Sequence, residues 1–220
     1  MRNATKIFTS TFGIIMALAG LEHGIGEVLQ GNVAPSGVMI LSWPESAFFH
    51  SLGGEPAMTI IPNLLLTGIL AIFFSLLMLV WSILFVQRKN GGLIMILLCI
   101  AMLLAGGGMF PPILGIIIGA VGTRINAPLT WRRKHLPLGL RHFLARLWPY
   151  FYAVCIPSWF ALVPGIPILS YFFGVNSTVV LLGILFFALS TLLLTILAGF
   201  AYDSERQTDS VSGRLISVAI

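Results

Sequence analysis

Residues 91–122 read GGLIMILLCIAMLLAGGGMFPPILGIIIGAVG, an apolar stretch without a single charged side chain. As one helix it would extend about 48 Å at 1.5 Å per residue, far beyond the roughly 30 Å hydrocarbon core of a bilayer. The glycines and prolines at its centre remove helix propensity and backbone donors. The pattern therefore predicts a hairpin, with a helix over 91–108, a turn near Pro111 and a short return over 113–123.

The rest of the chain has the composition of a membrane protein. Only 9% of its 220 residues are charged and 58% are hydrophobic, whereas soluble domains carry about 25% charged residues. This excludes a soluble globular enzyme and a disordered chain. Further apolar runs lie at 7–29, 59–86, 147–173 and 178–202.

The predicted fold class is therefore all-α, a polytopic integral membrane helical bundle of about six segments, two of them in the Gly/Pro-broken hairpin at 91–123. We expect one transmembrane domain over 1–202 and a polar cytoplasmic tail over 203–220. Two cysteines, Cys99 and Cys155, lie inside apolar runs, where cysteine acts as a small apolar side chain. Gly115 and Gly119 form a GxxxG pair, a pattern typical of closely packed membrane helices.

The placement of charge predicts the orientation. The loops at 30–58, 109–112 and 174–177 contain no Lys or Arg, so six segments put every basic residue on one side of the membrane. The positive-inside rule then places both termini in the cytoplasm. The expected location of the protein is the plasma membrane. Five segments would put the basic cluster at 124–146 outside. A cleaved leader ending after residue 19 remains an alternative, because residues 17–19 fit the A-x-A pattern.

Four of the seven acidic residues fall on the outer side, where no Lys or Arg can pair with them: Glu22, Glu27, Glu45 and Glu55. In a helix His23 and Glu27 share a face, and Glu22 lies about 22 Å into the first span. Ionisable residues within a span are candidates for a functional site.

We therefore expect an acidic outer-leaflet site that binds or transports a small or cationic solute. Glu22 would be the proton- or cation-binding carboxylate and His23 its proton partner, with Glu27 and Asn63 as the outer gate. Tyr171, at the end of the fifth segment, is expected at the same level.

Three other interpretations stay open for these residues. The hexapeptide at 22–27 can be the loosened end of the first helix. The chain can instead be a membrane-embedded, metal-dependent enzyme that uses His23, Glu27 and His50, although their spacing matches no zinc motif. It can also be a non-catalytic assembly subunit of a membrane complex. No phosphate-binding or serine-hydrolase motif is present, and no cofactor is expected.

The inner side is predicted to be basic. Residues 138–147 have the apolar spacing of a short amphipathic helix lying in the membrane interface. Basic side chains in this region would face anionic lipids or a partner subunit: Arg132, Arg133, Lys134 and Arg141. Alternatively they only fix the topology. Either interpretation explains the positive net charge without nucleic acid.

Overall fold

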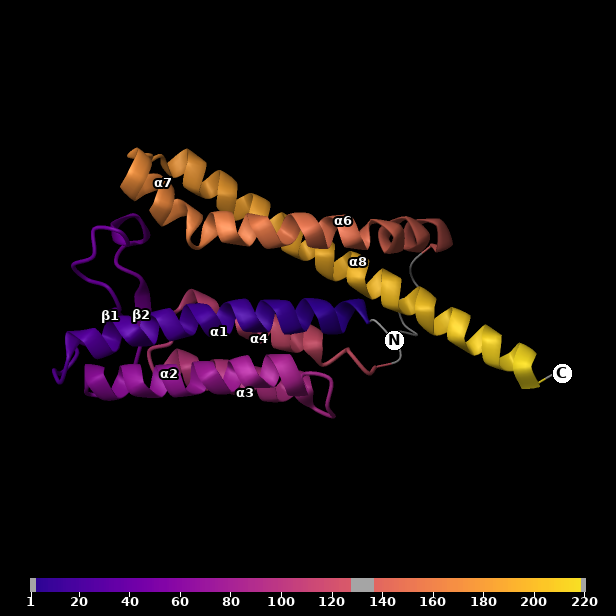
Figure 1. Ribbon diagram of the computed structural model, residues 1–220, viewed down its shortest axis with the longest axis horizontal. Coiled ribbons are helices and arrows are strands. Elements are labelled where there is room, and N and C mark those ends of the chain that lie inside the picture. Colours follow the sequence, from indigo (N-terminus) through magenta and orange to yellow (C-terminus); the bar gives the residue numbers. More distant parts are fainter. Residues whose placement is uncertain (1–2, 128–136, 219–220) are drawn as a thin grey trace.

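A computed structural model describes residues 3–127 and 137–218, with side chains described up to residue 207. Figure 1 shows long helices running back and forth along one axis, which confirms the helical fold class. The described α-helices are α1 (Ala4–Gln30), α2 (Leu64–Val80), α3 (Gly91–Leu104), α4 (Phe110–Gly122), α6 (Leu138–Leu162), α7 (Gly165–Phe173) and α8 (Thr178–Val218). A π-helical turn, Trp81–Phe85, continues α2.

Three described helices are long and apolar enough to cross a membrane: Ala4–Gln30, Leu64–Phe85 and Thr178–Gln207. The pair α6 and α7, bent by 46° at its junction, supplies a fourth if the two helices form one span. These apolar helices mark an integral membrane protein in contact with lipid. The shorter apolar helices α3 and α4 extend only about 21 and 20 Å, so they are shorter than an ordinary span.

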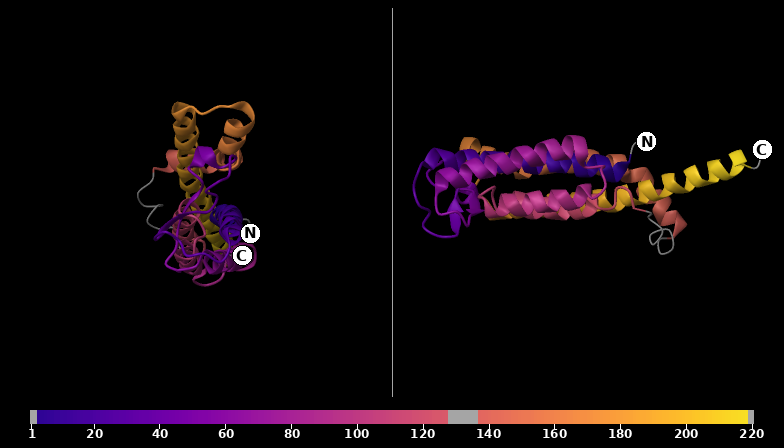
Figure 2. Two further views of the ribbon diagram at one scale, coloured as in Figure 1. Left: turned by 90° about the vertical axis from the view of Figure 1, so that its left-hand side faces the viewer. Right: turned by 90° about the horizontal axis from the view of Figure 1, so that it is seen from below.

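The helices form two groups (Figures 1 and 2). One group contains α1 to α4, and the other contains α6, α7 and α8. The loops at 31–63, 105–109 and 174–177 lie at one end of the long axis, which we call the loop end. The turn at 86–90 and the start of α1 lie at the opposite, terminal end.

The first group packs through small residues. A Cβ added to Gly24 of α1 would meet the backbone oxygen of Gly68 at 3.0 Å, so α1 and α2 approach almost to backbone contact. In the GxxxG pair, a Cβ on Gly115 would lie 2.4 Å from Cys99 Sγ, and one on Gly119 2.8 Å from Ile96. Both glycines therefore let α4 lie directly against α3, as the motif predicts.

The break in the 91–122 stretch is confirmed, but its position differs from the expected one. The first helix ends at Leu104, and the second begins at Phe110, so that both prolines lie in its first turn. Proline is tolerated there because the first backbone N–H groups of a helix have no partner within it. The turn itself uses Gly106 and Gly108, whose φ angles are +86° and +81°.

The second group differs more from the expected segment ends. Helix α6 begins at Leu138 and continues through Pro149 and Pro157 to Leu162. The expected amphipathic helix is thus the first part of one long helix. The direction changes beside Pro164, where α7 begins. Helix α8 continues past Tyr202 to Val218.

A small antiparallel hairpin, β1 (Met39–Leu41) with β2 (Pro56–Met58), covers the loop end of the first group. The second span begins after it, at Leu64, five residues later than the expected start at residue 59. The α3–α4 turn extends the hairpin, because the N–H of Gly106 donates to Met58 O at 2.9 Å and that of Met109 donates to Pro56 O at 3.1 Å. These bonds satisfy backbone groups that would otherwise be buried without partners.

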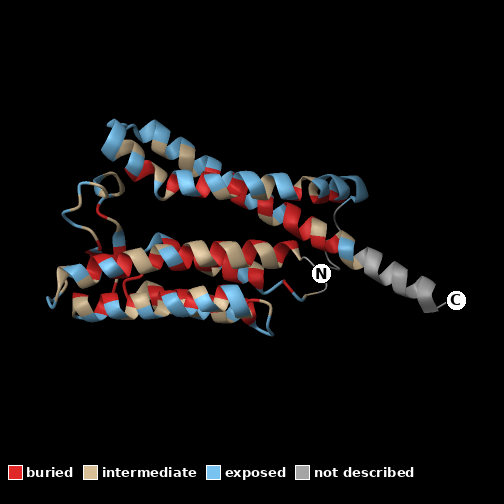
Figure 3. Ribbon diagram, in the orientation of Figure 1, coloured by how far each residue is buried: buried red, intermediate tan, exposed pale blue. Residues whose placement is uncertain are grey.

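The two groups are fastened at the terminal end. Asp203 of α8 accepts hydrogen bonds from the backbone N–H of Ala4 at 2.7 Å and of Thr5 at 2.9 Å, and from the Thr5 hydroxyl at 2.6 Å. A carboxylate at a helix N-terminus satisfies free N–H groups and interacts favourably with the helix dipole. Figure 3 shows the contrast along α8, which is buried near α1 and exposed at the loop end.

Candidate functional site

The candidate site lies at the loop end, where the last two turns of α1 meet the β-hairpin and the α3–α4 turn. Three polar side chains contact one another in series. His23 Nδ1 lies 2.9 Å from Ser42 Oγ, and Ser42 Oγ lies 3.3 Å from Glu27 Oε1. On the other side of the imidazole, His23 Nε2 lies 3.4 Å from Glu55 Oε2. The result is a row of four side chains in contact, Glu55–His23–Ser42–Glu27, which we call the polar series.

Hydrogen bonds to the backbone hold the two hairpin residues of the polar series, Ser42 and Glu55, in place. The N–H of Ser42 donates to the carbonyl of Glu55 at 3.0 Å. Gln30, in the last turn of α1, donates to Ser42 O at 3.0 Å and so ties the hairpin to the helix. Gly53, Gly54 and Glu55 all have positive φ, a conformation that is uncommon for a residue with a side chain. This turn directs the Glu55 carboxylate toward α1.

The α3–α4 turn covers Glu27 and His23 of the polar series. A Cβ at Gly106 would lie 2.3 Å from Glu27 Oε2, and one at Gly108 would lie 2.6 Å from the His23 ring. Positive φ and close approach both require glycine at these positions. Under this cover Glu27 is 0% exposed and His23 is 3% exposed.

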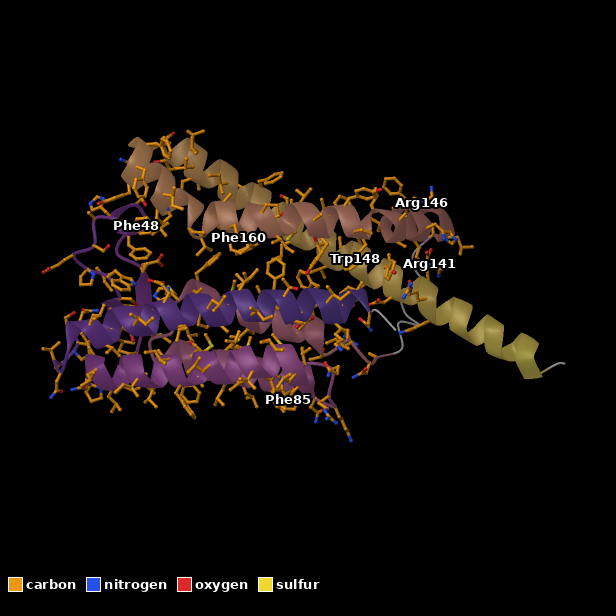
Figure 4. All side chains as sticks on the ribbon, in the orientation of Figure 1. Phe48, Phe85, Arg141, Arg146, Trp148 and Phe160 are labelled. Carbon is orange, nitrogen blue, oxygen red and sulfur yellow. The ribbon has the colours of Figure 1, made fainter. Side chains whose placement is uncertain are left out.

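A pocket of about 270 Å³ lies beside the polar series, between α1 and α6. Its walls are mainly apolar and aromatic, and two acidic residues line it, Glu22 and Glu55. Figure 4 labels Phe48 of the loop and Phe160 of α6. The remaining lining residues are Ile15, Leu18, Ala19, Phe49, Trp159, Val163 and Pro164.

Glu22 is only partly satisfied at the pocket wall. Its carboxyl group interacts with the Trp43 side chain, yet Glu22 Oε1 and Trp43 Nε1 are both buried without a partner in hydrogen-bond geometry among the described residues. An unpartnered buried acceptor costs about 1–3 kcal/mol relative to a hydrogen-bonded one. A donor or a cation entering the pocket would remove that cost.

The electrostatic surroundings of the pocket are acidic. The Lys and Arg residues whose side chains the structure describes belong to the start of α1, the turn at 86–90, the end of α4 and the terminal ends of α6 and α8. Figure 4 shows this for Arg141 and Arg146. Burial raises the pKa of Glu55 to about 7, because removal from water disfavours the charged form.

The predicted site residues divide into two sets. His23 and Glu27 are joined through Ser42, and Glu22 lies in the same two turns of α1. Asn63 lies elsewhere, at the N-terminus of α2, where its side chain accepts from Leu66 N at 3.0 Å and also contacts Asn32. Tyr171 of α7 is exposed, and its ring contacts Phe48 and Phe172.

The metal interpretation gains no support from this geometry. In residues 3–127 and 137–207, no three His, Cys, Asp or Glu side chains are grouped so that they could hold a metal ion. His50 lines a separate pocket with Asn176 and Ser177, near the α7–α8 turn. His23, Glu27 and His50 therefore do not converge on one point.

The inner basic residues lie at the terminal end or outside the described part. Arg141 is buried, and its Nε atom lies 3.7 Å from Glu205 Oε1. It thus pairs within the protein, whereas we expected it to face lipid or a partner. Arg132, Arg133 and Lys134 lie outside the described residues.

The sequence did not predict the role of Ser42 at the site or the role of Asp203 at the start of α1. Ser42 lies in a loop without periodicity, and nothing in the sequence shows that it reaches α1. Asp203 was assigned to a polar tail, because its partners, the first N–H groups of α1, are about 200 residues away in the chain. Only its position directly after an apolar run gave a signal.

No family model, curated protein or solved structure matches this chain. Its class is defined by its own helices, as an integral membrane protein with a mainly apolar pocket, bordered by Glu22 and Glu55, beside its first helix.

Proposed function

We propose that this protein binds a small hydrophobic cation in the pocket between α1 and α6. The observation that carries the proposal is the pair of carboxylates, Glu22 and Glu55, in a wall that is otherwise apolar and aromatic. No described Lys or Arg lies at this end of the molecule to neutralise them. An amine or quaternary ammonium group would supply the missing positive charge.

The aromatic rings favour an organic cation over a bare metal ion. Phe48, Phe49 and Trp159 line the pocket, and a cation over such a ring face gains about 0.5–2 kcal/mol. The volume of about 270 Å³ lies just below the usual range for ligand pockets, about 300–1,000 Å³. The expected ligand therefore has a single charged group and a compact apolar body.

The proposal includes six membrane segments with both termini in the cytoplasm of a plasma-membrane protein. The antiparallel order of the helices along one axis supports it (Figure 1). The basic residues gather at the terminal end, and the loop end lacks them, which matches the positive-inside rule. In this orientation the pocket faces the outer leaflet, where an external cation can reach it.

Transport would require the pocket to open toward the other side as well. The contacts favour the α6–α8 group as the moving part, because its polar contacts with α1 lie toward the terminal end. They include those of Asp203 with Ala4 and Thr5, and that of Tyr152 with Thr11 at 2.7 Å. Such rocking of one helix group against another is a common transport mechanism.

Binding can be tested with benzyltrimethylammonium, an aromatic cation whose charge does not depend on pH. Because Trp159 lines the pocket, its fluorescence reports occupancy in purified protein. We expect saturable quenching that weakens about tenfold or more in Glu22→Gln, which is the loss of about 1.4 kcal/mol of binding. Glu45→Gln is the matched control, because Glu45 is an exposed acid at the same end. Equal affinity in all three proteins would refute the proposal.

A further inference from the structure

Glu27 is the acid that the pocket does not use. Its side chain is fully buried, and neither its backbone nor its carboxylate lines the pocket. Oε1 contacts Ser42, whereas Oε2 has no hydrogen-bond partner among the described residues. An ionised carboxylate buried without a cation is strongly destabilised, so such a group takes up a proton.

The elements packed around this acid bring no charge that would change this conclusion. Gly106 of the α3–α4 turn lies against its oxygens, and the Thr67 methyl group of α2 borders the same glycine. The hairpin contributes Ser42, Trp43 and Glu55. The part of α6 that faces the pocket contributes apolar and aromatic side chains. The titratable neighbours are therefore Glu22, His23 and Glu55, and none of them supplies a permanent positive charge.

A proton on Glu27 fixes the direction of the hydrogen bonds in the polar series. The protonated carboxyl donates to Ser42 Oγ, and the single Ser42 proton is then free to be donated to His23 Nδ1. A neutral imidazole that accepts at Nδ1 carries its own proton on Nε2. That N–H faces Glu55 Oε2 at 3.4 Å.

The opposite direction gives a poorer arrangement. If Glu27 were ionised, Ser42 would donate to it and His23 Nδ1–H would donate to Ser42. The bare Nε2 lone pair would then face the Glu55 carboxylate, so that two acceptors oppose each other. This state combines an unpaired buried charge with a repulsive contact, and both raise its free energy.

We propose that Glu27 is a neutral positioning residue, which acts through Ser42 to hold His23 in the Nε2–H tautomer that anchors the Glu55 carboxylate at the cation pocket. This inference rests on the proposed function for its consequence, but its structural content is the tautomer of His23. It changes the role expected for Glu27, which becomes a support of the site and does not itself contact the solute.

Two substitutions of Glu27 distinguish a neutral acid from an ionised one. In Glu27→Gln the amide N–H can still donate to Ser42, as the protonated acid does. Glu27→Leu has a similar size and no donor. Ser42→Ala removes the middle of the polar series and leaves Glu27 in place, so it tests the coupling through Ser42 even if Glu27→Leu does not fold.

The test is nitrogen NMR of protein labelled in its histidines, with the His23 signals assigned from the His23→Gln variant. We expect the Nε2–H tautomer in the natural protein and in Glu27→Gln, and a mixture of tautomers in Glu27→Leu and Ser42→Ala. Benzyltrimethylammonium should bind the first two alike and the last two at least severalfold more weakly.

Two results would overturn the inference. One is a Glu27→Gln variant that loses the tautomer or the binding, since it would mean that Glu27 acts as an anion. The other is an unchanged His23 tautomer in Ser42→Ala. If no protein binds the cation while the tautomers behave as expected, the proposed ligand is wrong and the positioning role of Glu27 stands.

Discussion

His23 Nε2 lies 3.4 Å from Glu55 Oε2 and joins the first helix to the hairpin that covers it. The histidine is buried, and the carboxylate is 15% exposed, at the pocket wall. One contact therefore links the interior of the helix group with the surface that a solute can reach. The function of the site depends on the charge that Glu55 carries.

Cation binding should depend on pH through Glu55. Burial raises its pKa to about 7, and only the ionised form attracts a cation. The affinity for benzyltrimethylammonium should therefore be full above pH 8 and fall as the pH is lowered through 7. Fluorescence titrations across this range measure it. In Glu55→Gln the affinity should be lower, and the fall through pH 7 should become smaller; an unchanged profile in the variant would assign it to another group.

Gly106 should tolerate no side chain. Its φ is +86°, and an added Cβ would lie 2.3 Å from Glu27 Oε2. Gly106→Ala should destabilise the protein by about 2 kcal/mol, from backbone strain and overpacking together. The control is Gly183→Ala, because Gly183 lies in α8 with nothing within 4 Å of an added Cβ. Thermal unfolding in detergent compares the two, and equal midpoints would contradict the close packing of the turn.

Asp203 should protect the first turn of α1. Asp203→Ala removes three hydrogen bonds at the helix N-terminus, and loss of a capping side chain costs about 0.5–2 kcal/mol. Amide hydrogen exchange should accelerate at Ala4 and Thr5 and remain unchanged at the loop end of α1. Faster exchange along the whole helix would show instead that the two groups separate when this contact is lost.

The orientation can be tested with single added cysteines. Ala47 lies in the loop at 42–55 and Lys89 lies in the turn at 86–90, and both are exposed. The natural cysteines, Cys99 and Cys155, are buried, so their background labelling should be low. An impermeant thiol reagent should modify Ala47→Cys in intact cells and Lys89→Cys only after permeabilisation. The reverse pattern would place the pocket on the cytoplasmic side.

The sequence predicted the elements that depend on local pattern. The apolar run at 178–202 gave the start of α8, and the run at 7–29 located α1 to within three residues of its start at Ala4. The glycines and prolines at 106–112 showed that the hairpin must break. The ends of α3 and α4 were less predictable, because proline serves equally well in a turn and in the first turn of a helix. The continuity of α6 was missed because its first part is amphipathic and its later part apolar, which reads as two elements.

The site was predictable only on one side. Helical spacing placed His23 and Glu27 on one face, and their depth marked them as unusual. Ser42 and Glu55 reach them from a loop whose path depends on backbone pairing between β1, β2 and the α3–α4 turn, and no periodicity in the sequence encodes that pairing. Asn63 was expected at the site because of its level in the membrane, but it serves as the N-cap of α2.

The central claim is that the pocket selects its ligand by positive charge. It is tested by comparing benzyltrimethylammonium with neopentylbenzene, its uncharged carbon analogue, at equal free aqueous concentrations. The account predicts that the cation binds about tenfold more tightly or better, equivalent to at least about 1.4 kcal/mol, and that the preference disappears in the Glu22→Gln, Glu55→Gln double variant. Equal or tighter binding of the neutral analogue to the natural protein would contradict it.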